Sequence, residues 1–387
     1  MNRVAIGEEH TFEYVSDAKS LDAFVTNGLA DVDGATICLD IEEDREVRFL
    51  PSVALVQITV GTHDTILDPV LLDYDALAPV IEAICLTSES IIMHGARNDV
   101  TGLKRDFGVG PTKLKDTQIA ARFTGSSAFG LAPLLNEHFG IALDKALRRS
   151  RWIERPLSDK QLEYARCDTR YVGYLWETLV AEVERLGWGD ALAQECAAMN
   201  DMLAETSTLD RFGWRRVKGS KGLDELAQRR LAALWQWRDA AGRRHDTHVS
   251  RTLPPWALLH LAQNTDRVMR ESRDIQGLPK SMQRAERDIL FDLLSDPPEL
   301  PEKARPDRRA RTTRAERERF EARVERLQHW RLDASERTGI ESGFLAPKSL
   351  LEQIAGAKVS SADDYYDVAD LMQWRCDRFA GEWFALR

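Results

Sequence analysis

The chain has 387 residues, enough for two or three domains that each bury a hydrophobic core. Its formal net charge of −10 disfavours a protein that coats nucleic acid by bulk electrostatics, because phosphate binding depends on clustered lysines and arginines. The five cysteines are scattered and form no CxxC pair, which disfavours a disulfide framework and a structural zinc site. With no apolar stretch long enough to cross a bilayer and no signal-peptide pattern, the sequence predicts a cytoplasmic protein.

The first half of the chain alternates strand-like and helix-like segments, which indicates an α/β layer. Buried strands are predicted over 36–42, 53–60, 65–67 and 90–94, and a helix is predicted over 74–86. From residue 116 the pattern is helical, and one long helix is predicted from an N-cap at Ser158 to a stop at Gly187. We therefore expect an α/β domain over residues 1–195.

The second half of the chain is nearly all helical from about residue 205, and it repeats itself weakly. Residues 233–262 resemble residues 325–355, which predicts two copies of one helical unit, over 205–295 and 313–387. A charged, proline-rich segment over 296–312 is expected to link them. The tryptophans at helical positions are expected to pack in cores; they are Trp237, Trp330 and Trp374.

The first predicted strand ends in two carboxylates, Asp40 and Glu42. Side chains on a strand alternate between faces, so these two should point the same way. Two carboxylates 4 Å apart repel by about 4 kcal/mol at an effective dielectric constant near 20, so an interior pair needs a cation or a shared proton. An acidic turn at the end of the strand is the alternative interpretation.

Three further residues could complete a site with this pair. Asp99 follows the strand that ends at His94, where Asn98 or Asp99 could instead cap a helix. Tyr164 and Asp168 lie four residues apart on the predicted long helix and therefore share a face. An amphipathic helix that tolerates one aspartate is the alternative for this second pair.

The order of these residues is distinctive: Asp-x-Glu at a strand end, an aspartate about sixty residues later, and Tyr-x-x-x-Asp on a late helix. It resembles the tyrosine-bearing subgroup of the DEDD exonuclease superfamily. The segments over 48–58, 115–123, 129–145, 151–158 and 161–168 are similar to those of the ribonuclease D family, and the helical repeats resemble its HRDC domains. The resemblance implies an α/β ribonuclease H-like exonuclease domain followed by two all-α HRDC-like domains. The chain departs from the usual family pattern at Glu43 and Arg151.

The resemblance also implies an activity, that of a metal-dependent 3'-5' exoribonuclease that trims structured RNA such as tRNA precursors and releases nucleoside 5'-monophosphates. Two divalent ions, Mg²⁺ or Mn²⁺, would be held by Asp40, Glu42, Asp99 and Asp168, and Tyr164 would orient the attacking water. Carboxylate oxygens suit such hard cations. A monomer is expected. The alternatives are an exonuclease of the same subgroup that prefers DNA or short oligonucleotides, and a catalytically silent RNA-binding protein.

One basic segment is a candidate contact for the RNA backbone, and it spans residues 145–155. It carries a single acidic residue, Glu154, among five cations. The cations are Lys145, Arg148, Arg149, Arg151 and Arg155.

Overall fold

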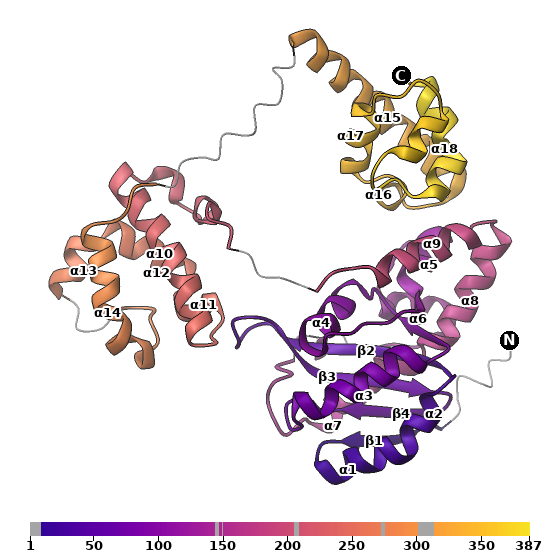
Figure 1. Cartoon of the computed structure of the whole chain (residues 1–387), viewed down its shortest axis with the longest axis horizontal. Coiled ribbons are helices and arrows are strands. Elements are labelled where there is room, and N and C mark those ends of the chain that lie inside the picture. The colour runs from indigo at the N-terminus through magenta and orange to yellow at the C-terminus, as the bar shows by residue number, and fades with distance from the viewer. Residues whose placement is uncertain (1–8, 144–146, 149, 205–208, 272–274, 301–312) are drawn as a thin grey trace. The chain divides into compact units, whose positions relative to one another are not determined.

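The computed structural model describes residues 9–143, 147–148, 150–204, 209–271, 275–300 and 313–387. The chain forms two compact units (Figure 1). The first unit comprises Met1–Glu42, Val53–Glu205 and Ala310–Arg387, and the second comprises Glu43–Ser52 and Thr206–Arg309. Within the described residues, no helix is both long and apolar enough to span a membrane.

A mixed sheet of six strands, counted over the described residues, forms the centre of the first unit, in the order β1-β4-β3-β2-β5-β6. β1 is parallel to β4, β4 is antiparallel to β3, and β5 is parallel to both β2 and β6. The sequence predicted four of these strands and missed β1 and β6, which are short and lie at the two edges. The strands are β1 Thr11–Val15, β2 Thr36–Asp44, β3 Ser52–Val60, β4 His63–Leu67, β5 Ser90–Met93 and β6 Leu114–Asp116.

Helices cover both faces of this sheet, and Figure 1 shows α3 crossing one of them. Along β2, Ile37, Leu39 and Ile41 face a core that they share with α3 and α4. Cys38 points to the other face and packs against Val172 of α8. Because side chains on a strand alternate, the two carboxylates of β2 share the face of Cys38 and point toward the α7 and α8 layer. These helices are α1 Ala18–Ala23, η2 Phe24–Gly28, α2 Leu29–Val32, α3 Tyr74–Thr87, α4 Arg97–Phe107, α5 Thr117–Phe123, α6 Leu131–Phe139, α7 Asp159–Arg170, α8 Val172–Arg185 and α9 Gly189–Asn200.

The prediction of one long helix after residue 158 was wrong, because two helices occupy this stretch. α7 begins after Ser158, which forms a capping box with Gln161 as its position predicted. The helix ends at Arg170, and the amide of the C-cap residue Tyr171 donates to the carbonyl of Thr169 instead of continuing the regular ladder. α8 then continues to Arg185. The break allows α7 to pack on β4 while α8 packs on β5.

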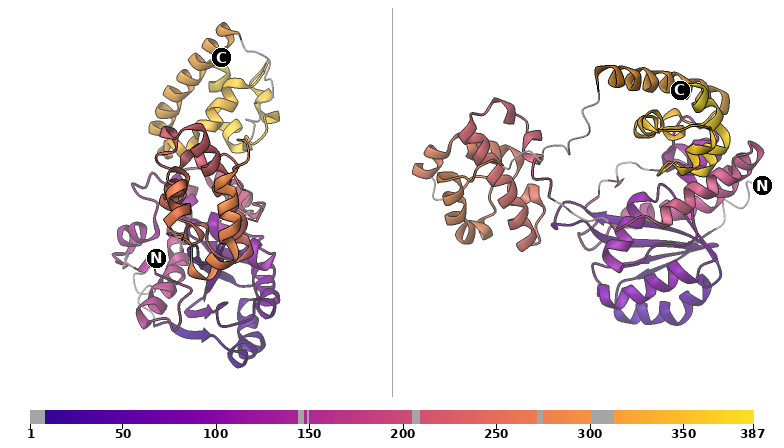
Figure 2. Two further views of the ribbon diagram at one scale, coloured as in Figure 1. Left: turned by 90° about the vertical axis from the view of Figure 1, so that its left-hand side faces the viewer. Right: turned by 45° about the horizontal axis from the view of Figure 1, so that its top comes forward.

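The C-terminal helices of the first unit share one hydrophobic core with α5, α8 and α9 (Figure 2). The Trp374 ring lies 5.5 Å from that of Phe123 and 6.1 Å from that of Trp188. Its indole N–H donates to Glu195 of α9 over 2.9 Å. These contacts make the C-terminal region part of the same folded body as the sheet. Its helices are α15 Arg314–Thr338, α16 Ser342–Leu345, α17 Lys348–Gly356, η6 Asp363–Asp367 and α18 Gln373–Ala385.

The second unit is a helical body built around α10, with a core of its own. Residues 43–52, which join β2 to β3, belong to this unit. The guanidinium of Arg243 lies 4.5 Å from the ring centroid of Phe49, and the amide of His248 donates to the carbonyl of Val47 over 2.9 Å. Its helices are η4 Gly213–Arg216, η5 Ser220–Gly222, α10 Glu225–Arg244, α11 Val249–Thr252, α12 Pro255–Gln263, α13 Thr265–Glu271 and α14 Lys280–Ser295.

The two helical regions repeat the same internal contacts. The indole N–H of Trp237 donates to Glu286 over 3.3 Å, and that of Trp330 donates to Glu382 over 2.6 Å. Each glutamate also accepts from an arginine that lies seven residues, about two turns, after its tryptophan on the same helix. Both tryptophans and Trp374 are buried, as expected. Residues 301–312 of the predicted linker lie outside the described residues. The HRDC-like assignment and the domain boundaries stay predictions.

Candidate active site

Three carboxylates from two elements converge on the α7 side of the sheet. Asp40 and Glu42 come from the end of β2, and Asp168 comes from the last part of α7. One oxygen atom of each lies within 4.8 Å of the others. All three side chains are partly exposed, so a small ligand can reach them. The structure therefore brings together three of the four acids that the sequence singled out.

The fourth acid, Asp99, lies in the first turn of α4, outside this group of three. The predicted capping role is wrong, because the N-cap position is Ala96 rather than Asn98 or Asp99. The carboxylate of Asp116, at the end of β6, accepts from the amides of Gly95 and Ala96, at 2.9 Å each. Asp116 therefore satisfies the amides at this turn, and the charge of Asp99 contributes to raising the pKa of Glu42.

Burial raises the pKa of each of the three carboxyl groups, and repulsion by neighbouring carboxylates adds to this effect for Glu42 and Asp168. Burial raises the pKa of Asp40 to about 7, although the amide of Ile41 partly offsets this shift. Burial and then the charges of Asp40, Asp168 and Asp99 raise the pKa of Glu42 well above its usual range. Burial and the charge of Asp40 do the same for Asp168. A divalent cation would relieve this repulsion and favour the deprotonated carboxylates, so the group is suited to metal binding.

Tyr164 lies one turn before Asp168 on the same face of α7. A hydrogen bond from its side chain lowers the pKa of Asp168 against the larger effect of burial. Burial and the charges of Asp168, Glu42 and Asp40 raise the pKa of the phenol above its usual range. The hydroxyl therefore keeps its proton at neutral pH and can act as a hydrogen-bond donor. The Trp152 ring lies 6.0 Å away and packs against it.

The basic segment near this site is only partly described. Lys145 and Arg149 lie outside the described residues. Arg148 is exposed, and its charge partly offsets the burial that raises the pKa of Glu42 and of Asp168. Arg148 therefore lies within electrostatic range of the carboxylates. Arg151 is 54% exposed and forms an ion pair of 2.5 Å with Glu154.

The RNA-contact prediction does not fit Arg155, whose side chain is bound inside the fold. Its Nε and Nη2 each lie 2.6 Å from an oxygen of Asp68, in a pair whose side chains are 10% and 0% exposed. The same guanidinium donates to the carbonyl of Ala54 over 2.9 Å. Sequence reasoning missed Asp68, although its place directly after the apolar strand "TIL" is the same signal that pointed to Asp40.

Comparison with known proteins agrees with this geometry. A family model described as a 3'-5' exonuclease matches residues 12–184. The chain is 32% identical over 330 residues to ribonuclease D of Xanthomonas oryzae, an alignment that covers 83% of this chain and 86% of the relative. The chain belongs to the ribonuclease D family.

Two solved structures resemble this ribonuclease D family member over nearly the whole chain. Ribonuclease D of Escherichia coli, described as an exoribonuclease involved in structured RNA processing, is 25% identical with a TM-score of 0.64, over 97% of this chain and 98% of that one. A protein from Bifidobacterium adolescentis has a TM-score of 0.75 over 97% of this chain and 98% of its own, at 20% identity, and so shows the fold alone. The ribonuclease H-like exonuclease fold, with a mixed sheet and a helical C-terminal region, is thereby confirmed.

Proposed function

We propose that this ribonuclease D family member trims the 3' ends of structured RNA, such as tRNA precursors, and releases nucleoside 5'-monophosphates. The relatives and the exonuclease match make it a 3'-5' exoribonuclease. The observation that carries the proposal is the convergence of Asp40, Glu42 and Asp168 within 4.8 Å. The family is divalent-metal dependent, and an acidic group of this kind supplies the oxygen ligands that such an ion needs.

Two Mg²⁺ or Mn²⁺ ions fit the donor set. Asp40, Glu42 and Asp168 would hold one of them, and Asp40 with Asp99 would hold the other. When bound, such a pair makes water a better nucleophile and stabilises the leaving oxygen of the phosphodiester. The raised pKa values of the carboxyl groups support this assignment, because the charge of Arg148 offsets only part of the effect of burial and of the neighbouring acids.

Tyr164 would orient the attacking water. Its phenol keeps its proton, because burial and the neighbouring acids raise its pKa, so it serves as a donor and not as a general base. The side-chain contact with Asp168 places the hydroxyl beside the carboxylate group. The aromatic contact with Trp152 limits the orientations that the ring can take.

RNA would approach along the basic side of the site. Arg148 and Arg151 are exposed there and are the proposed contacts for the RNA backbone, whereas Arg155 is excluded by its pair with Asp68. Lys145 and Arg149 stay predictions. The two helical regions, as HRDC-like domains, would extend the surface that grips a structured RNA. A monomeric state and a cytoplasmic location also stay predictions.

The test is a time course on 3'-extended tRNA and matched single-stranded DNA, each labelled at the 5' end, with Mg²⁺, Mn²⁺ or a chelator. Stepwise shortening of the RNA that requires metal is expected, and Asp40→Ala should abolish it. Glu182→Ala is the matched control, since Glu182 pairs with Arg185 on the surface of α8. Faster shortening of the DNA would favour the alternative exonuclease. RNA binding without shortening of either polymer would favour the silent binding protein.

A further inference from the structure

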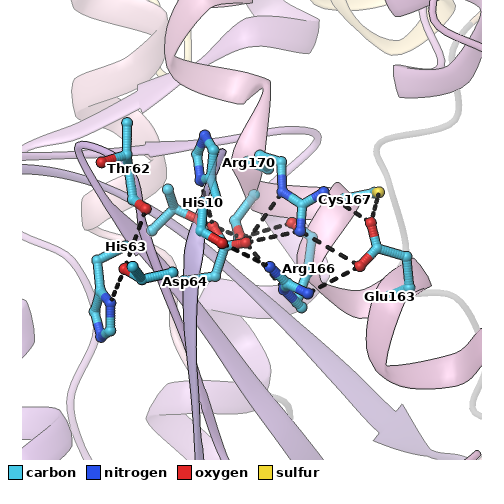
Figure 3. Close-up of polar contacts among 11 residues, drawn as sticks. His10, Thr62, His63, Asp64, Glu163, Arg166, Cys167 and Arg170 are labelled. Atoms are coloured by element: carbon cyan, nitrogen blue, oxygen red, sulfur yellow. Dashed lines mark hydrogen bonds and ion pairs between the residues drawn. The ribbon is translucent and has the colours of Figure 1, made fainter. Parts of the chain in front are cut away.

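A second polar cluster lies where α7 meets β4 (Figure 3). Its centre is Asp64 of β4, which is 1% exposed. The Nε of Arg166 lies 3.0 Å from Oδ2 of Asp64, and Nε and Nη2 of Arg170 lie 3.0 and 2.9 Å from the same oxygen. Residues two apart on an α-helix are about 200° apart around its axis, so Arg166 points away from Tyr164 and Asp168.

Two further contacts tie this centre to the sheet. The other oxygen of Asp64, Oδ1, lies 2.9 Å from Nδ1 of His10 and accepts from the hydroxyl of Thr59 over 3.0 Å. The Thr59 hydroxyl also bonds that of Thr169 on α7 over 2.8 Å. The contacts of Oδ1 with His10 and Thr59 therefore fix the carboxylate of Asp64, while its Oδ2 binds the arginines of α7.

The two arginines are held from outside as well. Glu163, which is 51% exposed, accepts from Arg166 over 3.0 Å and from Arg170 over 2.7 Å. Each guanidinium thus bridges a buried and an exposed carboxylate. Planar guanidinium groups bind carboxylates in defined directions. The ion pairs of Arg166 and Arg170 with Asp64 therefore hold α7 against the sheet and also restrict its orientation.

Apolar packing constrains the orientation of α7 only in part, because its larger apolar side chains, Leu162 and Tyr164, are partly exposed. The fully buried residues of α7 are Ala165 and Thr169, both small. In contrast, α8 buries Val172, Leu175 and further large side chains against its neighbours. Small residues leave a helix free to rotate about its axis, because they fill no specific pocket. The ion pairs with Asp64 resist such rotation, together with the hydrogen bond between Thr59 and Thr169.

Rotation of α7 matters because the candidate site spans two elements. A carboxylate about 5 to 6 Å from a helix axis moves by about 1 Å for each 10° of rotation. Misplacement by about 1 Å can lower a reaction rate by about 100-fold. We propose that Asp64 is a positioning residue, which fixes the rotation of α7 and so brings Tyr164 and Asp168 to the carboxylates of β2. This inference rests on the proposed function.

The experiment compares Asp64→Asn with the wild-type protein and with Glu182→Gln, which also removes one charge but lies on the surface of α8. Mn²⁺ binding is measured by electron paramagnetic resonance of the free ion, without turnover. Steady-state kcat and KM are measured on 5'-labelled, 3'-extended RNA. For Asp64→Asn we expect the Mn²⁺ dissociation constant to rise about 10-fold or more and kcat to fall about 10- to 100-fold, with KM within about twofold. Glu182→Gln should match the wild type in all three.

A purely structural role for Asp64 would give a different result: a lower melting temperature, with kcat per folded molecule and Mn²⁺ affinity unchanged. That result would overturn the proposal. If Asp64→Asn does not fold, Arg170→Lys replaces it, since lysine keeps the charge but loses the planar fork. We then expect a smaller shift of the same two quantities, about three- to tenfold, and no shift would refute the positioning role.

Failure of the proposed function is distinguishable from failure of this inference. Wild-type protein that shortens no RNA would contradict the proposed function. The Mn²⁺ measurement would still decide the positioning role, because it needs no substrate. Asp40→Ala provides the reference for complete loss of the ion site.

Discussion

The ion pair between Arg155 and Asp68 gives a sharp prediction for stability. Asp68 is fully buried, and its two oxygens accept from Arg155, whose guanidinium also donates to the carbonyls of Trp152 and Ala54. Arg155→Met keeps the length of the side chain but leaves the aspartate without its cation. Removal of one partner from a buried pair costs about 3 to 5 kcal/mol. Since domains are stable by about 5 to 15 kcal/mol, the variant should lose about a fifth of that stability or more.

Arg151→Met is the matched control, because it removes an arginine from the same segment. Its ion pair with Glu154 is more than half exposed, so its loss should cost less than about 1 kcal/mol. Urea unfolding of the full chain, followed by far-ultraviolet circular dichroism, measures both variants. Folded Arg155→Met should bind 3'-extended RNA within about twofold of the wild type, whereas Arg151→Met should bind it more weakly. Equal losses of stability in the two variants, or loss of RNA affinity in Arg155→Met alone, would refute the reasoning.

Three further predictions concern the site and the C-terminal helices. Tyr164→Phe should lower kcat about 100-fold in steady-state assays, because it removes only the hydroxyl that would orient water. KM and the melting temperature should be nearly unchanged. Full activity of this variant would contradict the role of the hydroxyl. Burial raises the folded-state pKa of Asp40 to about 7, so the metal-free protein should lose stability as the pH rises from about 4 through 7. Mg²⁺ should therefore raise the calorimetric melting temperature more at pH 8 than at pH 5.5. Equal shifts at the two pH values would be inconsistent with this account. Trp374→Ala should destabilise the first unit by about 3 to 5 kcal/mol and speed limited proteolysis of α18. Leu332→Ala, at an exposed position, should do neither. A stable Trp374→Ala protein would argue against the shared core.

The carboxylates of the site could be predicted from sequence because their signals are local. Strand alternation places Asp40 and Glu42 on one face, and helical periodicity does the same for Tyr164 and Asp168. Neither rule depends on what packs nearby. The family resemblance then supplied the order in which the two pairs meet.

The features that were missed depend on distant partners. A cation in a basic run has the same sequence signature whether it meets an RNA phosphate or a buried carboxylate, and Arg155 finds Asp68 87 residues earlier in the chain. The end of α7 was missed because the apolar pattern continues through Tyr171 and Val172, although the two helices pack on different strands. The packing of α18 on α9 could not be predicted either, because the sequence pattern of an apolar helix face does not depend on which element covers it.

The first unit is assembled from stretches of sequence that flank the whole helical body of the second. Loop-closure entropy grows only with the logarithm of loop length, so a long insertion between these stretches costs the folded state little. The insertion has a larger effect while the chain is being synthesised. The faces of α5, α8 and α9 that cover Trp374 emerge from the ribosome well before α15 to α18 exist. Until those helices are made, the nascent chain presents an apolar surface, and chaperone binding to that intermediate should fall once α18 has emerged from the ribosome.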